Sequence, residues 1–339
     1  MHIGVIGAGL MGSTHVRIVN AAVSGAHVVA VSDPVAENAL RVASEAGVPT
    51  IYADARELIR DPEVEAVIIA SPAHTHEDFT LACLREGKPV LCEKPLAASA
   101  DACRRVLDAE SALGRRLVQV GFMRRYDPGY VDLKQRLDDG AVGEPLIVHC
   151  AHRNAVAPAT FTSEMVITDS VVHEIDTVRW LLGEEIARAT VFAPRASGLA
   201  ADGLQDPQVV MLETASGRLV EIECFVNAQY GYDIRCEVVA ETGTLELAAP
   251  ATVAARHAGG HALDVPDGFQ QRFGTAYLHE LQSWVAGRGE PAGPDAWDGY
   301  AAAAVCEACV ESLHTRRPVE VELAPRPGLY AHAHDLVAR

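Results

Sequence analysis

The sequence lacks three features that would each place it in a distinct class of proteins. No apolar run in its 339 residues approaches the roughly 20 residues that a membrane-spanning helix needs. Basic residues are few, since 28 lysines and arginines face 46 aspartates and glutamates, for a formal net charge of −18. A surface of this sign repels nucleic acid and anionic membranes, so we expect neither as a partner. The chain begins in its first expected strand, and we therefore expect no signal peptide.

Cysteine is present, but without a pattern that indicates disulfides or a metal. The eight cysteines are scattered among apolar segments. Cys306 and Cys309 have C-x-x-C spacing, yet they lie in an alanine-rich stretch and no second pair accompanies them. We interpret the cysteines as buried small residues of a reduced, cytoplasmic protein. His74 and His76 also lack further ligand groups at metal-type spacing, so we expect no metal site.

The first 120 residues alternate between short apolar runs and helical patterns. The apolar runs are Ile3–Ile6, Val28–Val31, Ala66–Ala70, Val90–Cys92 and Leu117–Val120. The helical patterns lie near Ser13–Val23, Val35–Ala46, Ala53–Arg60, His76–Gly87 and Ser99–Gly114. This alternation predicts βαβ units, and hence a doubly wound parallel sheet covered on both faces.

A glycine-rich turn after the first apolar run is the strongest functional signal. Gly7, Gly9 and Gly12 have the spacing G-x-G-x-x-G, and Asp33 ends the second apolar run about 20 residues later. Strand, glycines, helix, strand and acid in this order form the fingerprint of a dinucleotide-binding Rossmann domain. The alternative is an ordinary glycine-containing turn between a strand and a helix.

Each part of this turn has a physical reason to bind a dinucleotide. Gly7 allows a sharp turn, Gly9 lets the backbone approach a pyrophosphate, and Gly12 lets helix and strand pack closely. The helix N-terminus offers N–H groups and a partial positive charge to the phosphates. Asp33 would accept hydrogen bonds from ribose hydroxyls and repel a 2′-phosphate, which favours NAD over NADP. The residues of the turn assigned to the cofactor are Gly7, Gly9, Leu10, Met11 and Gly12.

Polar residues also follow two later strands of the expected sheet. Ser71-Pro72 ends one strand, with His76 shortly beyond it, and Glu93-Lys94-Pro95 ends the next. Ligands of open parallel sheets bind at the carboxyl ends of the strands, so topology places these residues near a cofactor. The Lys94–Pro95 bond is a candidate for the cis form. The further residues assigned to the cofactor are Asp33, Ser71, Pro72, His76 and Glu93.

The pattern changes after Gly121. Helices are expected over Pro128–Asp138, about Asp169 to Leu182, about Gln270–Ala286 and Asp295–Thr315, and strands over Leu146–His152, Val220–Val226, Ile234–Val239 and Leu245–Leu247. The later strands alternate strictly between apolar and polar residues, which predicts a mostly antiparallel sheet with one buried face. We therefore expect a Rossmann domain over residues 1–121 and an α+β domain with a large open-faced sheet over 122–339, whose last helices can pack back on the first domain.

The helix containing Asp169 and His173 has two different faces in projection. At 100° per residue, one face within about 60° gathers Asp169, His173, Asp176 and Trp180, and the opposite face gathers Val171, Ile175, Val178 and Leu182. The apolar stripe would anchor the helix, leaving the polar face directed away from that anchor. An imidazole beside a carboxylate is a natural general base where such a face lines a cleft. The alternative is that the face with Asp169 and His173 is simply exposed to solvent and has no catalytic role.

These motifs together resemble the glucose–fructose oxidoreductase/inositol dehydrogenase/MocA family. The resemblance rests on the glycine turn, on Glu93-Lys94-Pro95 and on Asp169-x-x-x-His173, and it runs nearly end to end. Longer strings resemble the inositol-oxidising branch of the family: 120–127, 149–154, 172–176, 230–234 and 296–300. Two departures from that branch are Ala155, where a proline is expected, and the Ser71–His74 loop.

The resemblance implies NAD(P) chemistry on polyols or sugars by a homotetramer or homodimer. Carried over by motif, it implies Lys94, Asp169 and His173 as the catalytic group. It implies a substrate site of Arg124, His152, Asn154 and Tyr232. The expected reaction is NAD-dependent oxidation of a ring secondary alcohol of a cyclitol, with myo-inositol as substrate. The alternatives are a dehydrogenase for another polyol or sugar (scyllo-inositol, chiro-inositol or an aldopyranose) and a non-catalytic NAD-binding sensor.

Overall fold

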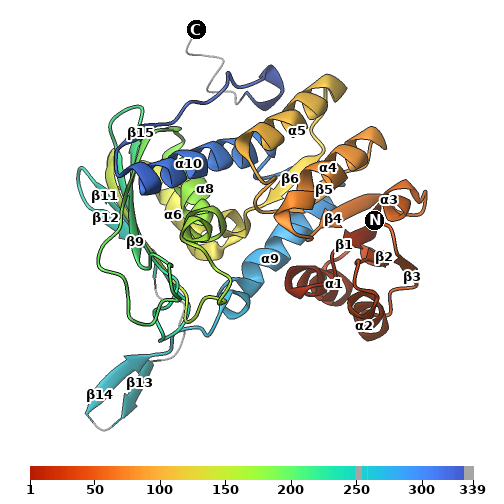
Figure 1. The fold of residues 1–339 in the computed structure, drawn as a ribbon, viewed down its shortest axis with the longest axis horizontal. Coiled ribbons are helices and arrows are strands. Elements are labelled where there is room, and N and C mark those ends of the chain that lie inside the picture. Colours follow the sequence, from red (N-terminus) through yellow and green to blue (C-terminus); the bar gives the residue numbers. More distant parts are fainter. Residues whose placement is uncertain (249–253, 258, 332–339) are drawn as a thin grey trace. The chain divides into compact units, whose positions relative to one another are not determined.

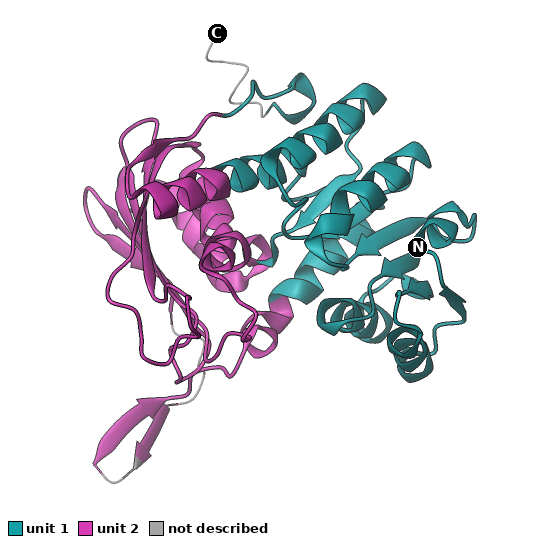
Figure 2. Ribbon diagram, in the orientation of Figure 1, with its two compact units in different colours: residues 1–123, 276–304, 323–339 teal, residues 124–275, 305–322 magenta. Residues whose placement is uncertain are grey.

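The structure is a computed structural model that describes residues 1–248, 254–257 and 259–331 (Figure 1). The chain divides into two compact units (Figure 2). The first unit contains residues 1–123, 276–304 and the segment from 323 onward, and the second contains 124–275 and 305–322. Two long helices, α9 (Phe269–Ala286) and α10 (Ala296–Thr315), therefore contribute residues to both units.

The first unit is built on a six-stranded sheet in which every pairing is parallel. In spatial order its strands are β3 (Thr50–Tyr52), β2 (His27–Ser32), β1 (His2–Ile6), β4 (Ala66–Ile69), β5 (Val90–Glu93) and β6 (Val118–Gly121). The chain reverses its direction of winding between β1 and β4, which is where open parallel sheets bind their ligands. The predicted doubly wound parallel sheet is thus confirmed.

Helices connect these strands and bury the apolar faces of the sheet. They are α1 (Leu10–Ala22), α2 (Ala36–Ala46), α3 (Ala55–Arg60), α4 (His76–Arg85) and α5 (Ala100–Leu113), with a 3-10 turn at Ala73–Thr75. Val5, Ile68 and Leu91 on three neighbouring strands are fully buried and share one core cluster with Val16 of α1 and Trp284 of α9. Burial of each such side chain contributes about 1.5–3 kcal/mol. Strand β3 was not predicted, because its three residues are only partly buried and show no apolar run.

The second unit contains, within the described residues, a seven-stranded sheet that is mostly antiparallel. In spatial order its strands are β12 (Thr244–Glu246), β11 (Asp233–Ala240), β7 (Pro145–Arg153), β10 (Leu219–Phe225), β9 (Gln208–Thr214), β8 (Ile186–Phe192) and β15 (Val319–Glu320). Only the central pair β7 and β10 is parallel among these pairings. The second unit also contains a hairpin of β13 (Ala254–His257) and β14 (Gly260–Leu263). A 3-10 turn at Met123–Tyr126 lies at the boundary of the two units, and another at Gly328–Tyr330 belongs to the first.

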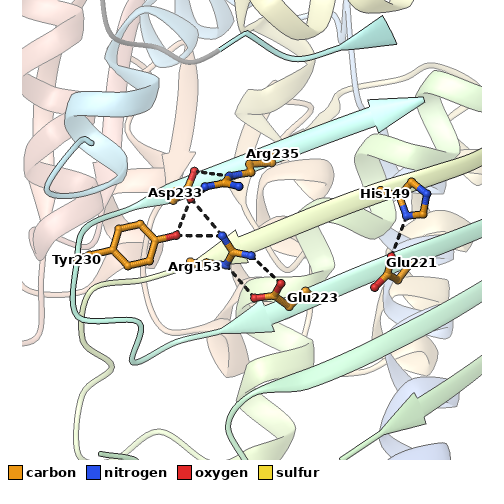
Figure 3. A network of polar contacts seen from close by, with 7 residues as sticks. All are labelled: His149, Arg153, Glu221, Glu223, Tyr230, Asp233 and Arg235. Carbon is orange, nitrogen blue, oxygen red and sulfur yellow. Dashed lines mark hydrogen bonds and ion pairs between the residues drawn. The ribbon is translucent and has the colours of Figure 1, made fainter. Parts of the chain in front are cut away.

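The two faces of this sheet differ in polarity, as the alternation predicts. Val220, Ile222 and Cys224 of β10 are fully buried, whereas Glu221 and Glu223 between them are partly exposed. On the polar face Arg153 binds both Glu223 of β10 and Asp233 of β11, and His149 and Glu221 form a separate pair (Figure 3). The helices of the unit are α6 (Pro128–Asp138), α7 (Ser163–Met165), a π-helical segment (Val166–Val171) and α8 (Val172–Leu182).

The helix expected from Asp169 to Leu182 differs from its projection in two ways. Asp169 lies in the π-helical segment, where hydrogen bonds span five residues, so 100° per residue does not describe its direction. Helix α8 is buried on every side from Val172 to Arg179, including His173 and Asp176. Glu174 and Asp176 of α8 meet charged partners, Arg124 and Arg125, inside the unit. A plain solvent face is excluded for His173 and Asp176.

All eight cysteines carry free thiols and are buried. The interpretation of Cys306 and Cys309 as buried small residues is thereby confirmed. Burial raises the pKa of the Cys309 thiol to about 12, which keeps it protonated and unreactive. Within the ranges that the structure describes, no helix is both long enough and apolar enough to cross a bilayer.

Two glycines of the first turn are required by the fold itself. Gly7 has a φ of +93°, and a Cβ there would lie 2.4 Å from the Ala70 carbonyl oxygen. A Cβ on Gly12 would lie 1.8 Å from the Gly7 carbonyl oxygen. Both contacts are with backbone atoms, which cannot turn aside as a side chain can. The close packing of α1 against the ends of β1 and β4 therefore depends on glycine at these two positions.

We predict that Gly12→Ala lowers the free energy of unfolding by at least about 2 kcal/mol, because the added methyl group overlaps fixed backbone. Gly9→Ala is the matched control, since a Cβ there meets no heavy atom within 4 Å. Its expected change is below about 0.5 kcal/mol, as for a surface substitution. Urea denaturation followed by circular dichroism measures both. Equal stability of the two variants would contradict this account of the turn.

Candidate active site

The glycine turn of the first unit forms a cradle that the protein itself leaves open. Gly9 precedes the first residue of α1, and Leu10 is 61% exposed. Because a Cβ on Gly9 would meet nothing within 4 Å, protein packing does not explain a glycine at this position. The first N–H groups of α1 have no acceptor within the helix and carry its partial positive charge. The residues present therefore fit a dinucleotide whose pyrophosphate lies against Gly9.

Asp33 stands beside this cradle at the carboxyl end of β2 and helps to shape it. One carboxylate oxygen, Oδ2, accepts a hydrogen bond of 2.7 Å from the Ala8 amide, and Oδ1 accepts one of 2.8 Å from the Val35 amide. Arg41 donates a hydrogen bond of 3.3 Å to the Ala8 carbonyl oxygen. Asp33 thus has a structural task in addition to the predicted contact with ribose hydroxyls.

His76 connects the loops that follow β4 and β5. Its Nδ1 lies 2.7 Å from the carbonyl oxygen of Pro95, and its Nε2 lies 2.7 Å from that of Ser71. Burial lowers the pKa of His76, whereas the two carbonyl oxygens act in the opposite direction. Since both ring nitrogens are occupied by backbone groups, His76 holds the Ser71-Pro72 loop and the Lys94-Pro95 turn together. Its predicted contact with the cofactor stays a prediction.

Glu93 is buried and connects the Lys94 turn to helix α1. Its Oε1 lies 2.6 Å from Nε2 of His15, which is fully buried on α1. Its Oε2 accepts a hydrogen bond of 3.2 Å from the Lys94 amide. The Lys94–Pro95 peptide bond is cis, as the sequence suggested. The turn that carries Lys94 is therefore fixed from two sides, by His76 and by Glu93.

In the second unit, Arg124, Glu174 and His152 form a buried cluster. Arg124, in the 3-10 turn at Met123–Tyr126, is only 1% exposed and binds the Glu174 carboxylate of α8. His152 of β7 places Nδ1 3.0 Å from Oε2 of Glu174 and 3.2 Å from Nη2 of Arg124. Burial alone would raise the pKa of Glu174, but Arg124 and His152 together hold it below its usual value. The carboxylate is thus ionised inside the protein.

The histidine that was predicted as the base lies next to this cluster. The ring centroids of His152 and His173 are 6.4 Å apart, and those of His152 and Tyr232 are 5.8 Å apart. Burial raises the pKa of Tyr232 to about 12, so its hydroxyl keeps its proton. The structure therefore brings four of the predicted residues together: Arg124, His152, His173 and Tyr232.

The other predicted residues have less defined surroundings. Asn154 directly follows β7, and its amide donates a hydrogen bond of 3.0 Å to the Phe225 carbonyl oxygen. Asp169 is exposed on the π-helical segment, four residues before His173. Lys94 belongs to the first unit and His173 to the second, so their convergence on one substrate stays a prediction.

Two partners in these sites, His15 and Glu174, were not singled out by the sequence analysis. Asp176 was placed on the polar face of its helix, but its pairing with Arg125, through hydrogen bonds of 3.0 and 2.6 Å, was not predicted. A signal existed for Glu174, because a carboxylate between the apolar residues of a core helix needs a cation or donors. No local pattern indicates which distant residue supplies them.

Known protein families match most of the chain. Residues 1–122 match the family described as "Oxidoreductase family, NAD-binding Rossmann fold", and residues 134–321 match its "C-terminal alpha/beta domain". Inositol 2-dehydrogenase 1 of Saccharopolyspora erythraea is 54% identical over 97% of this chain and 99% of its own. Inositol 2-dehydrogenase of Azotobacter vinelandii is 47% identical over 98% and 99%.

A solved structure extends the likeness to the fold of the whole chain. Myo-inositol dehydrogenase of Lactobacillus casei, crystallised with NAD(H) and myo-inositol, superposes with a TM-score of 0.94 at 36% identity, covering 98% of this chain and 99% of that one. Both domains of the family are matched, and relatives well above 30% identity span nearly the full length. The chain therefore belongs to the glucose–fructose oxidoreductase/inositol dehydrogenase/MocA family of oxidoreductases.

Proposed function

We propose that the protein is an NAD-dependent inositol 2-dehydrogenase, which oxidises a ring secondary alcohol of myo-inositol to the ketone scyllo-inosose. The main support for this proposal is the end-to-end similarity to inositol 2-dehydrogenases and to a structure that holds both NAD(H) and myo-inositol. Two features of this chain support it. The space at Gly9 fits a pyrophosphate, and the buried group of His152, His173 and Tyr232 offers polar atoms to a polyol.

The proposed chemistry divides between cofactor and protein. NAD, when bound, supplies the acceptor for the hydride that leaves the alcohol carbon. His173 accepts the proton of the reacting hydroxyl as general base, and Asp169 stabilises the resulting imidazolium. Lys94 donates a hydrogen bond to the oxygen as negative charge develops on it. His76 and Glu93 position Lys94 through the turn that they hold.

The remaining residues determine which hydroxyl reacts. We propose that His152, Asn154 and Tyr232 bind ring hydroxyls and that Arg124 completes this site. Holding the ring in one orientation lowers the barrier because the reacting atoms need no further search. On the cofactor side we keep Gly7, Gly9, Leu10, Met11 and Gly12 at the phosphates, Asp33 at the ribose, and Ser71, Pro72, His76 and Glu93 near the nicotinamide.

We further propose a cytoplasmic homotetramer, with a homodimer as the alternative. Eight free thiols favour a reducing compartment. The polar face of the seven-stranded sheet carries an ordered network in which Arg153 binds Glu223 and Tyr230, and Asp233 binds Tyr230 and Arg235 (Figure 3). Ordered charges on a sheet that also exposes Phe192 of β8 suit a surface that pairs with a second copy.

A dehydrogenase for another polyol or sugar is the second candidate. Two departures from the inositol-oxidising branch favour it, namely Ala155 beside Asn154 and the Ser71–His74 loop. Both adjoin residues that we assign to substrate or cofactor, so they can change which hydroxyl pattern fits. A non-catalytic NAD-binding sensor is a third reading, and it requires NAD binding without turnover of any polyol.

A substrate panel separates these functions. Purified protein with saturating NAD is offered myo-, scyllo- and chiro-inositol and an aldopyranose, and formation of NADH is followed by its absorbance. We expect the highest kcat/KM with myo-inositol and a ketone product of inosose mass. A higher kcat/KM with another polyol would assign the second candidate. NAD binding without turnover of any compound would assign the sensor.

For the base, we predict that His173→Ala lowers kcat by about 100-fold or more while the Kd for NAD stays within about twofold, because only proton transfer is lost. His314→Ala is the control, since His314 is an exposed imidazole at the end of α10. It should keep wild-type kcat. Near-normal turnover of the His173 variant would reject its assignment as general base.

For cofactor choice, we predict that Asp33→Ala weakens NAD binding and reduces the preference for NAD over NADP, because the repulsion of a 2′-phosphate is removed. Because Asp33 also binds the Ala8 amide, the denaturation midpoint is measured in parallel. Glu37→Ala, an exposed acid in the first turn of α2, is the control. An unchanged ratio of the two Kd values in a folded Asp33 variant would show that Asp33 does not read the ribose.

A further inference from the structure

We propose that Glu174 is a positioning residue that fixes the tautomer of His152, so that Nδ1 carries the proton and Nε2 receives a hydrogen bond from a substrate hydroxyl. Glu174 belongs to none of the groups that the mechanism above uses. The assignment of the tautomer follows from contacts inside the second unit. The role given to Nε2 rests on the proposed function.

The first step is the position of the Glu174 carboxylate against His152. Both oxygens face Nδ1, at 3.1 Å for Oε1 and 3.0 Å for Oε2. An ionised carboxylate only accepts hydrogen bonds. If Nδ1 were unprotonated, its lone pair would face two carboxylate oxygens in a buried site, and Oε2 would receive no hydrogen bond from the imidazole. A proton on Nδ1 turns the same contact into a charge-assisted hydrogen bond.

Arg124 makes the competing contact, and it decides the charge of Glu174. Its Nη2 lies 3.2 Å from Nδ1 of His152 and could donate a hydrogen bond there only if Nδ1 were unprotonated. That contact is longer than either carboxylate contact and involves a neutral acceptor. Arg124 also binds Oε1 of Glu174, and both side chains are 1% exposed. The guanidinium therefore holds the Glu174 carboxylate ionised and oriented. The carboxylate in turn accepts a hydrogen bond from the protonated Nδ1 of His152.

The second step concerns Nε2 of His152, the ring nitrogen that faces away from Glu174 in the hydrogen-bonding pattern. A neutral imidazole with its proton on Nδ1 has an acceptor at Nε2. A hydroxyl group can donate to that acceptor, whereas a ring carbon without a hydroxyl cannot, so His152 selects for a hydroxyl at one ring position. His173 lies 6.4 Å away between ring centroids and takes the proton of the reacting hydroxyl. The two imidazoles thus have separate tasks, one in substrate choice and one in proton transfer.

Helix α8 links these tasks, because Glu174 directly follows His173 in the chain. The same stretch of helix supplies the base and the carboxylate that orients the neighbouring imidazole. This arrangement resembles the way in which an outer carboxylate sets the tautomer of a ligating or catalytic histidine in many enzymes. It gives Arg124, within the proposed substrate site, the task of holding the Glu174 carboxylate.

The test begins with a measurement that needs neither turnover nor an altered carboxylate. The full-length protein is labelled with ¹⁵N-histidine, and the ring resonances of His152 are assigned by their loss in His152→Asn. Nitrogen chemical shifts distinguish a protonated from an unprotonated ring nitrogen. We expect Nδ1 protonated and Nε2 unprotonated at neutral pH. The opposite tautomer in the wild-type protein overturns the proposal.

Kinetics of variants provide the second arm. Glu174→Gln should raise KM for myo-inositol about tenfold or more, with kcat within about threefold and an unchanged Kd for NAD, because substrate binding rather than proton transfer is lost. It should also bring the Nε2-protonated form into the spectrum. If the single variant does not fold with Arg124 uncompensated, Arg124→Met with Glu174→Gln removes both charges, and the His152 tautomer in the ¹⁵N spectrum is then the readout.

Glu164→Gln is the matched control, because Glu164 forms an exposed imidazole–carboxylate pair with His314 at 3.2 Å in the same unit. It should leave KM and the His152 resonances unchanged. A folded Glu174 variant with wild-type KM and an unchanged His152 tautomer overturns the proposal. Failure of the proposed function has a different signature, since wild-type protein would then turn over no polyol while the tautomer of His152 still reports on Glu174.

Discussion

A carboxylate buried away from water must be met by donors, and this constraint organises the candidate sites of both units. In the first unit Glu93 is matched by His15 and by the Lys94 amide. In the second, Glu174 is matched by Arg124 and His152. A buried ion left without its partner costs several kcal/mol, so each pair fixes the relative position of the elements that supply it. The need to pair these buried carboxylates thus fixes the polar residues of the sites before any ligand binds.

Much of the fold was predictable, because its signals are local. The strands of the parallel sheet are apolar on both faces and are separated by helical patterns, and the observed bounds differ from the expected ones by a few residues. Helix α6 was predicted at its observed bounds, because Asp127 caps its N-terminus and Pro128 occupies the first turn. Strand β3 was missed because it is short and only partly buried. Strand β8 was also missed, although buried and exposed residues alternate along part of it, and no local pattern indicated the π-helical segment before α8.

The candidate site was predictable as a set of residues but not as a set of contacts. Glycine spacing and strand ends indicate the cofactor region, since backbone geometry there requires particular residues. Pairs such as His15 with Glu93 or Arg124 with Glu174 join residues far apart in the sequence, and periodicity says only which face is buried. The projection of α8 shows the difference. It separated polar from apolar residues correctly. The polar residues nevertheless lie in the interior, where charged side chains pair with them, as Arg125 does with Asp176.

The open space at Gly9 has a consequence for how such chains diverge. Gly7 and Gly12 are retained by folding, because the backbone around them admits no side chain. Nothing in the described protein enforces Gly9, so only a bound nucleotide can select against its loss. A descendant that no longer needed the cofactor could drift at this position while keeping its shape. A larger residue at the second glycine, with the first and third intact, would therefore mark a pseudoenzyme within an otherwise well-preserved lineage.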